Sequence, residues 1–120
     1  MEEAVAVDPA PSEEDRLNRA FAALSDPLRR RLVARLAQGD ATVNELAEPF
    51  SVTLQAVSKH LKVLEDAGLI TRSREAQRRP CHLDPEALGR LTAWIEGYRQ
   101  TVEERYARLD ALLASQEDQP

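Results

Sequence analysis

The segment 53–67 carries polar side chains that recur at a spacing of three or four residues. Residues at this spacing share one face of a helix, so we expect these side chains to lie together. Their amide, hydroxyl and ammonium groups are of the kinds that contact DNA base edges and phosphates. The same face would also suit the solvated side of an ordinary amphipathic helix, and the spacing leaves both interpretations open. The residues concerned are Gln55, Ser58, Lys59 and Lys62.

Four arginines follow within eight residues: Arg72, Arg74, Arg78 and Arg79. These like charges repel one another, and a nearby polyanion would offset the repulsion. The cluster therefore favours contact with a DNA backbone or an adjacent minor groove over a solvated loop. The formal net charge is −5, but residues 16–116 hold all sixteen Lys and Arg and thirteen of the 21 acids, a net of +3. The basic residues therefore form a central region between acidic ends.

The composition limits the classes of protein to which this chain could belong. Its 120 residues suffice for one domain, and 42% hydrophobic with only 4% aromatic residues predicts a helical core of Leu, Val and Ala. The single cysteine excludes an internal disulfide. The longest uncharged run, residues 49–58, is too short to cross a bilayer, and the acidic start does not resemble a signal peptide. We expect a soluble cytoplasmic protein that has no contact with a membrane.

Start and stop signals divide the chain into five helices and one hairpin. Ser12, Asp26, Thr42 and Thr53 each precede a stretch with helical periodicity and are predicted N-caps. The predicted helices begin at Glu13, Pro27, Val43, Leu54 and Pro85, the last ending near Ser115, and the hairpin spans 69–83, with no glycine at its turn.

The order of these elements indicates the fold. A short helix, a tight break, a second helix and a two-stranded hairpin are typical of a helix-turn-helix followed by a wing. The sequence thus predicts a mainly α protein with a small β-hairpin, a winged helix-turn-helix domain over residues 12–115. Residues 1–11 and 116–120 lack a period and are predicted to be mobile tails.

The side of the 54–67 helix opposite the polar face is apolar. Leu54, Val57, Leu61 and Leu64 share this side, and Ala56, Val63 and Ala67 widen it. We expect it to pack against the core. His60 lies near the middle of the same arc and is therefore predicted to be a packed, hydrogen-bonded histidine, not a DNA contact.

Longer stretches of the chain resemble a known family. The segments FAALSDPLRRRLVARL, TVNELAEPFSVTLQAVSKHLKVLEDAGLI and HLDPEAL are similar to the ArsR/SmtB family of prokaryotic winged-helix repressors over about residues 16–113. The resemblance implies a homodimer that binds an inverted-repeat operator and blocks transcription. It also implies that Gln55, Ser58 and Lys59 meet bases and nearby phosphates, with Thr53 at the helix start. Leu54 departs from the family, which usually has a polar residue there.

The last predicted helix carries an apolar stripe about 45 Å long at 1.5 Å per residue. A winged helix of ~70 residues is too small to cover such a stripe, which favours burial against a second copy over packing within one chain. Together with the first helix, as the resemblance also implies, it predicts a homodimer interface formed by Leu17, Phe21, Leu91, Ile95, Tyr98, Val102, Tyr106, Leu109 and Leu113, with Leu88 at the start of the stripe.

Metal and enzyme chemistry are not predicted. Metal-sensing relatives carry paired cysteines where this chain has Thr42-Val43-Asn44-Glu45, or histidines on the last helix, which has none here. Cys81 and His82 are adjacent on a strand and so point to opposite faces. Motifs for phosphate loops, metalloproteases and nucleophile elbows are missing. No cofactor is expected; a thiol- or metal-responsive repressor using Cys81, and a winged helix that binds protein, remain as alternatives. The residues identify neither the operator sequence nor an effector.

Overall fold

The structure is a computed structural model that describes residues 12–117; the predicted tails at 1–11 and 118–120 lie outside the described residues. It confirms the predicted fold class of helices with one small hairpin. The last helix continues through residues 116 and 117, which the sequence had assigned to a tail. The elements are α1 (Glu13–Ala23), α2 (Pro27–Leu36), α3 (Val43–Ala47), α4 (Leu54–Asp66), β1 (Ile70–Arg72), β2 (Cys81–Leu83) and α5 (Pro85–Glu117).

Side-chain caps begin the first four helices, as predicted. The oxygens of Ser12, Asp26, Thr42 and Thr53 each accept the backbone N–H three residues later, at 3.0–3.3 Å. Each contact satisfies an amide that has no partner within the helix. The starts of these helices are therefore fixed by the sequence next to them.

The core lies where α2, α3 and α4 meet the base of the hairpin. Helix α4 contacts α2, α3 and β1, and β2 contacts α2. The side chains that meet there exclude water from one side of α4 and leave its other side exposed. The largest fully buried side chains are Leu32, Leu46, Val57, Leu61, Leu64, Leu69, Ile70 and Cys81.

The hairpin, which we call the wing, comprises β1, β2 and the connection between them. Its antiparallel register pairs Ile70 with Leu83 and Arg72 with Cys81. At the tip Glu75 and Arg78 exchange backbone hydrogen bonds of 2.8 and 2.9 Å. Ala76 in this turn has φ +56°, so an alanine takes the left-handed conformation that glycine usually supplies, at a cost of about 1 kcal/mol.

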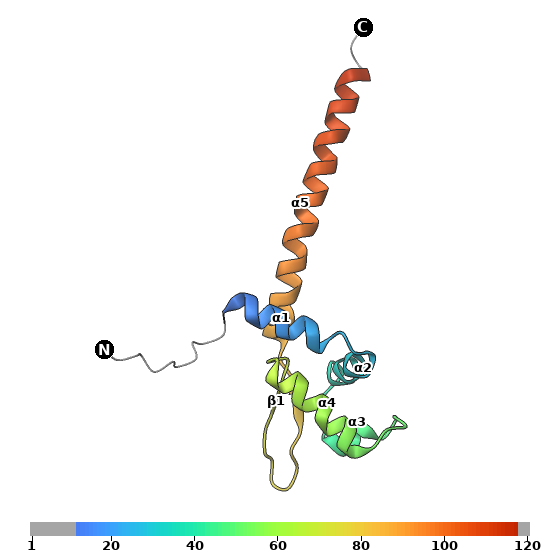
Figure 1. Ribbon diagram of the computed structural model, residues 1–120, viewed down its shortest axis with the longest axis vertical. Coiled ribbons are helices and arrows are strands. Elements are labelled where there is room, and N and C mark those ends of the chain that lie inside the picture. The colour runs from blue at the N-terminus through green and yellow to red at the C-terminus, as the bar shows by residue number, and fades with distance from the viewer. Residues whose placement is uncertain (1–11, 118–120) are drawn as a thin grey trace, which may run out of the picture.

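Helix α5 and the wing project in opposite directions from the core (Figure 1). Helix α1 crosses the base of α5 and contacts both α5 and α4. Of its 33 residues, α5 buries only Ala87 and Leu91. Among the helices over residues 12–117, none combines the length and the apolar character that a membrane crossing demands.

Candidate nucleic-acid interface

One side of α4 packs on the core, and the opposite side presents the predicted contact residues. Val57, Leu61 and Leu64 are buried, whereas Gln55 and Lys59 are exposed. Lys62 is also exposed and Ser58 is half-buried, while Thr53 caps the helix start. The polar face predicted from the spacing is thus present on the helix that follows the turn.

Two residues assigned to the apolar side are exposed instead. Leu54 retains 49% of its exposure and Val63 retains 40%. Leu54 is the first residue of α4, and Val63 lies at the edge of the apolar side. The prediction that both face the core is therefore wrong.

An open groove between α4 and β1 brings most of the predicted residues together. Its volume is about 440 Å³, and Gln55, Ser58, Lys59 and Lys62 line it together with Glu65 and Arg72. Amide, hydroxyl and ammonium groups therefore converge on one concave surface. A surface of this kind offers donors for base edges and charge for phosphates.

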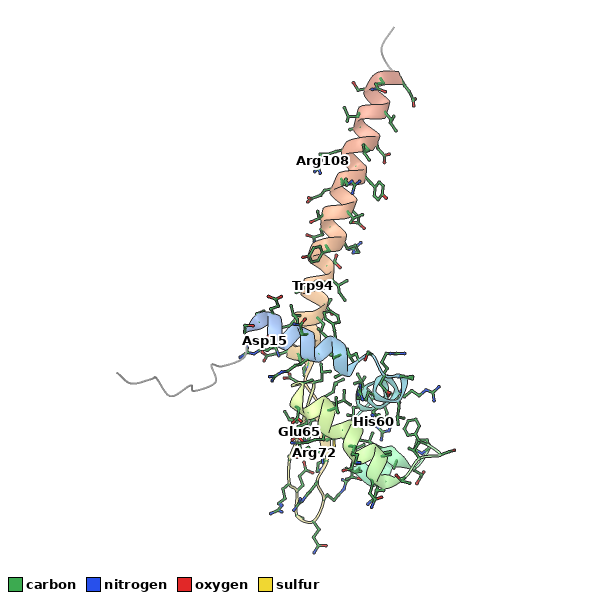
Figure 2. All side chains as sticks on the ribbon, viewed as in Figure 1. Asp15, His60, Glu65, Arg72, Trp94 and Arg108 are labelled. Atoms are coloured by element: carbon green, nitrogen blue, oxygen red, sulfur yellow. The ribbon has the colours of Figure 1, made fainter. Side chains whose placement is uncertain are left out.

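Two of the four wing arginines have carboxylate partners within the protein, which the sequence did not reveal. Arg72 Nε lies 3.4 Å from Glu65 Oε1, and Figure 2 shows these side chains beside each other between α4 and the wing. Arg78 Nη2 donates to Glu45 Oε1 at 2.9 Å. Arg74 and Arg79 are exposed, and within residues 12–117 neither forms a salt bridge.

The carboxylate that holds Arg78 is itself fixed. The backbone N–H of Thr42 donates to Glu45 at 2.8 Å, and this bond is the largest cause of a pKa below the usual range for Glu45, with the Thr42 hydroxyl and Arg78 adding to it. Glu45 therefore stays ionised at neutral pH. The capping box of α3 thus also anchors the wing.

His60 belongs to the scaffold, as expected. Its Nδ1 lies 3.1 Å from Arg29 Nη1 and 3.9 Å from Asp26 Oδ2. Arg29 also donates its Nε–H to the carbonyl of Ala23 at 2.6 Å. These contacts tie α4 to the connection between α1 and α2.

Cys81 and His82 point in different directions, as predicted for neighbours on a strand. The Cys81 side chain is fully buried, and burial raises the pKa of its thiol. A buried thiol with a raised pKa has little thiolate character, which disfavours a reactive cysteine. His82 is directed instead toward Ser73 and Asp40.

The apolar stripe on α5 divides into a covered and an uncovered part. Leu91 is only 6% exposed and packs in the core of its own chain, so it offers little surface to a second copy, and its assignment to the interface stays a prediction. Leu17 and Phe21 on α1 are half-buried against the same core. The uncovered part consists of Ile95, Tyr98, Val102, Tyr106, Leu109 and Leu113, which are 45–61% exposed.

Trp94 and Leu112 widen this stripe, although the sequence reasoning missed them. Trp94 makes an edge contact with Phe21 at a centroid distance of 5.4 Å and lies 4.8 Å from Tyr98. Trp94 lies three residues after Leu91 and four before Tyr98, and Leu112 lies three after Leu109, so the helical spacing could have identified both. A hollow of about 500 Å³ beside the aromatic rings is lined by Glu13, Glu14, Leu17, Asn18, Phe21, Trp94 and Tyr98.

Comparisons with known proteins agree with this geometry. A family described as a helix-turn-helix domain matches residues 24–73, from before α2 to just after β1. The HTH-type transcriptional regulator Rv2034 of Mycobacterium tuberculosis is 40% identical over 92 residues, which cover 77% of this chain and 86% of that protein.

Solved structures show the same architecture. The crystal structure of the ArsR family transcriptional regulator RHA00566 has a TM-score of 0.69 at 38% identity and covers 75% of this chain and 93% of that one. A homodimeric winged helix-turn-helix DNA-binding domain from Mycobacterium bovis, a possible ArsR-family regulator, has a TM-score of 0.60 at 27% identity, covering 77% of this chain and 85% of that one.

Proposed function

Since the chain belongs to the ArsR family of winged helix-turn-helix transcriptional regulators, we propose that it is a repressor that binds an inverted-repeat DNA operator as a homodimer. The resemblance to that family noted in the sequence is confirmed by these relatives. They are regulators of transcription, which supports a role without catalysis.

The observation that carries the proposal is the position of the polar face of α4. This face forms one wall of the groove beside β1, and the wing that bears the arginines follows directly. In the proposed complex α4 enters the major groove, where Gln55 and Ser58 contact base edges. Lys59 and Lys62 contact phosphates, and Arg74 and Arg79 reach the backbone or the adjacent minor groove.

The uncovered stripe on α5 supports the homodimer. Contiguous exposed apolar surface of this kind marks an interaction site in soluble proteins. A second copy carries the same stripe, so a symmetric contact covers both surfaces at once. Under this proposal the stripe from Ile95 to Leu113 and the hollow beside Trp94 receive side chains of the partner.

The test separates residues that read sequence from residues that bind any DNA. A duplex is first selected from a random-sequence library with the wild-type protein, and its affinity is then measured as a function of salt. Lys59→Ala or Lys62→Ala should weaken binding to all sequences and reduce the salt slope by about one unit each, whereas Gln55→Ala should relax preference at one base pair.

Arg108→Ala is the matched control, because Arg108 lies far along α5 from α4 (Figure 2). It removes one positive charge and should leave the affinity within about twofold, since it lies well beyond the ~10 Å Debye length from the proposed interface. Unchanged affinity in all three α4 variants would show that α4 does not read DNA. Binding to another protein with an affinity that does not change with salt concentration would favour a protein-interaction module instead.

A further inference from the structure

Three polar side chains lie in contact with one another at the base of the wing. Ser73 directly follows β1, His82 lies in β2, and Asp40 lies in the connection between α2 and α3. Ser73 Oγ is 2.6 Å from His82 Nε2, and His82 Nδ1 is 2.8 Å from Asp40 Oδ2. These contacts therefore join both sides of the wing to the segment that precedes α3.

Contacts on both sides of the ring restrain His82. Nε2 and the hydroxyl of Ser73 form a hydrogen bond, and the carboxylate of Asp40 lies in ion-pair contact with Nδ1. A carboxylate beside Nδ1 favours a hydrogen on that nitrogen, which leaves Nε2 to accept from the hydroxyl of Ser73. Together these contacts restrain the imidazole of His82 and with it the base of the wing.

Two further contacts lie along the same edge of the wing. Ala41 and Cys81 exchange backbone hydrogen bonds of 2.8 and 3.3 Å, and Arg78 pairs with Glu45 near the tip. The wing is thus attached from base to tip to the segment 40–45. Because α3 begins within this segment and packs on α4, these contacts set the position of the wing relative to α4.

A serine, histidine and aspartate in this order also activate serine in hydrolases. Catalysis there needs backbone N–H donors that face the developing oxyanion. The N–H of Ser73 is already bonded to the carbonyl of Pro80 at 3.1 Å, so the donor closest to the hydroxyl is occupied. This arrangement favours a positioning role over a catalytic one.

We propose that Asp40, His82 and Ser73 are positioning residues for DNA binding, which hold the wing so that Arg74 and Arg79 face the same duplex as α4. This inference rests on the proposed function. None of the three residues needs to touch DNA. Loss of the contacts among these three side chains leaves the wing arginines present but poorly oriented. DNA binding then weakens although the charge of the surface is unchanged or more positive.

Asp40→Ala gives a test in which two explanations predict opposite signs. Removing a carboxylate from a DNA-binding protein should tighten binding if only net charge matters. Positioning by Asp40 predicts instead a loss of about tenfold in affinity for a duplex selected with the wild-type protein, as wing contacts to phosphate are lost. Glu48→Ala is the matched control, because Glu48 is an exposed acid at the end of the neighbouring α3, and it should bind equally or more tightly.

Two further variants separate positioning from simple destabilisation. Asp40→Asn keeps an oxygen that can lie beside Nδ1 of His82 and should bind at least as tightly as the wild-type protein. His82→Phe should lose affinity as Asp40→Ala does, and should lose nothing more when Arg74→Ala and Arg79→Ala are already present. Asp40→Ala decides the matter if His82→Phe does not fold, because the Asp40 side chain is 57% exposed and outside the core.

Tighter binding by Asp40→Ala, or losses that add fully to those of the arginine variants, would overturn the inference. The failure of the proposed function looks different. In that case the wild-type protein selects no duplex from the library, and both proposals are refuted together.

Discussion

Leu109→Glu should separate the proposed dimer into monomers. Leu109 lies in the uncovered stripe of α5 and is 45% exposed in the single chain. The C-terminal part of α5, which carries it, extends away from the core and from α4 (Figure 1). Replacement of Leu109 therefore leaves the contacts within one chain almost unchanged. In a dimer formed through the stripe, however, two new carboxylates would face apolar surface.

The expected magnitude follows from the exposed fraction. Full burial of a leucine side chain contributes roughly 1.5–3 kcal/mol, so covering the remaining 45% contributes about 1 kcal/mol in each chain, or about 2 kcal/mol in a symmetric dimer. Leu109→Ala should then raise the dimer Kd about thirtyfold. Each of the two unpaired carboxylates costs roughly 2 kcal/mol or more in addition, which brings the total to about 6 kcal/mol, so Leu109→Glu should raise the dimer Kd about ten-thousandfold or more.

Sedimentation velocity measures the association, and the affinity for the selected duplex measures its consequence. Two α4 helices must lie about 34 Å apart to enter successive major grooves, so a folded monomer should bind one half-site weakly and lose the tight complex. Ala111→Glu is the control, because position 111 lies about 200° around the helix from position 109. A Leu109→Glu protein that stays dimeric, or that binds the duplex tightly as a monomer, would refute the interface.

Three other predictions concern individual groups. Zinc, cadmium or arsenite should change DNA affinity by less than about threefold, below the ~5–150-fold typical of allosteric coupling, since Cys81 is buried and His82 is bound to Asp40; a tenfold change reversed by a chelator would contradict this. Iodoacetamide should modify Cys81 much more slowly in the native protein than in urea, because burial removes the thiol from solvent and raises its pKa, and equal rates would disprove it. Hydrogen bonds from Thr42 lower the pKa of Glu45 below its ordinary 4.5, so the stability that this carboxylate contributes is present at neutral pH and is lost as the pH falls through the lowered pKa. Urea unfolding should therefore show Glu45→Gln to be less stable than the wild-type protein at pH 7 and closer to it at pH 2.

The elements were predictable from sequence because their signals are local. A cap such as Thr42 binds the amide of Glu45 three residues later, so both partners fall within one short window. The same holds for Thr53 and Ala56 at the start of α4. The polar face of α4 was predictable for a related reason, since helical spacing places Gln55 and Ser58 near one another whatever surrounds them.

The contacts that hold the wing were not predictable in this way. Arg78 and Glu45 are far apart in sequence, as are Asp40 and His82, and their pairing depends on how the hairpin folds back on α3. The helical periodicity also placed Leu54 on the core side, where the structure leaves it exposed, and it did not show that Leu91 packs in the core of its own chain. A periodic pattern gives the angle of a side chain around its helix but not where the neighbouring elements end.

Helix α1 connects the two surfaces on which the proposed function depends. It packs against α4, which carries the polar face, and against α5, which carries the uncovered stripe. At the second contact the ring of Phe21 lies against Trp94, where the stripe leaves the core. The distance between two α4 helices in a dimer is therefore set by the α1–α5 junction as well as by the stripe itself. A substitution of Phe21 should therefore alter DNA affinity although the DNA-facing residues stay the same. It changes the angle between α5 and the rest of the domain, and with it the distance between the two α4 helices of a dimer.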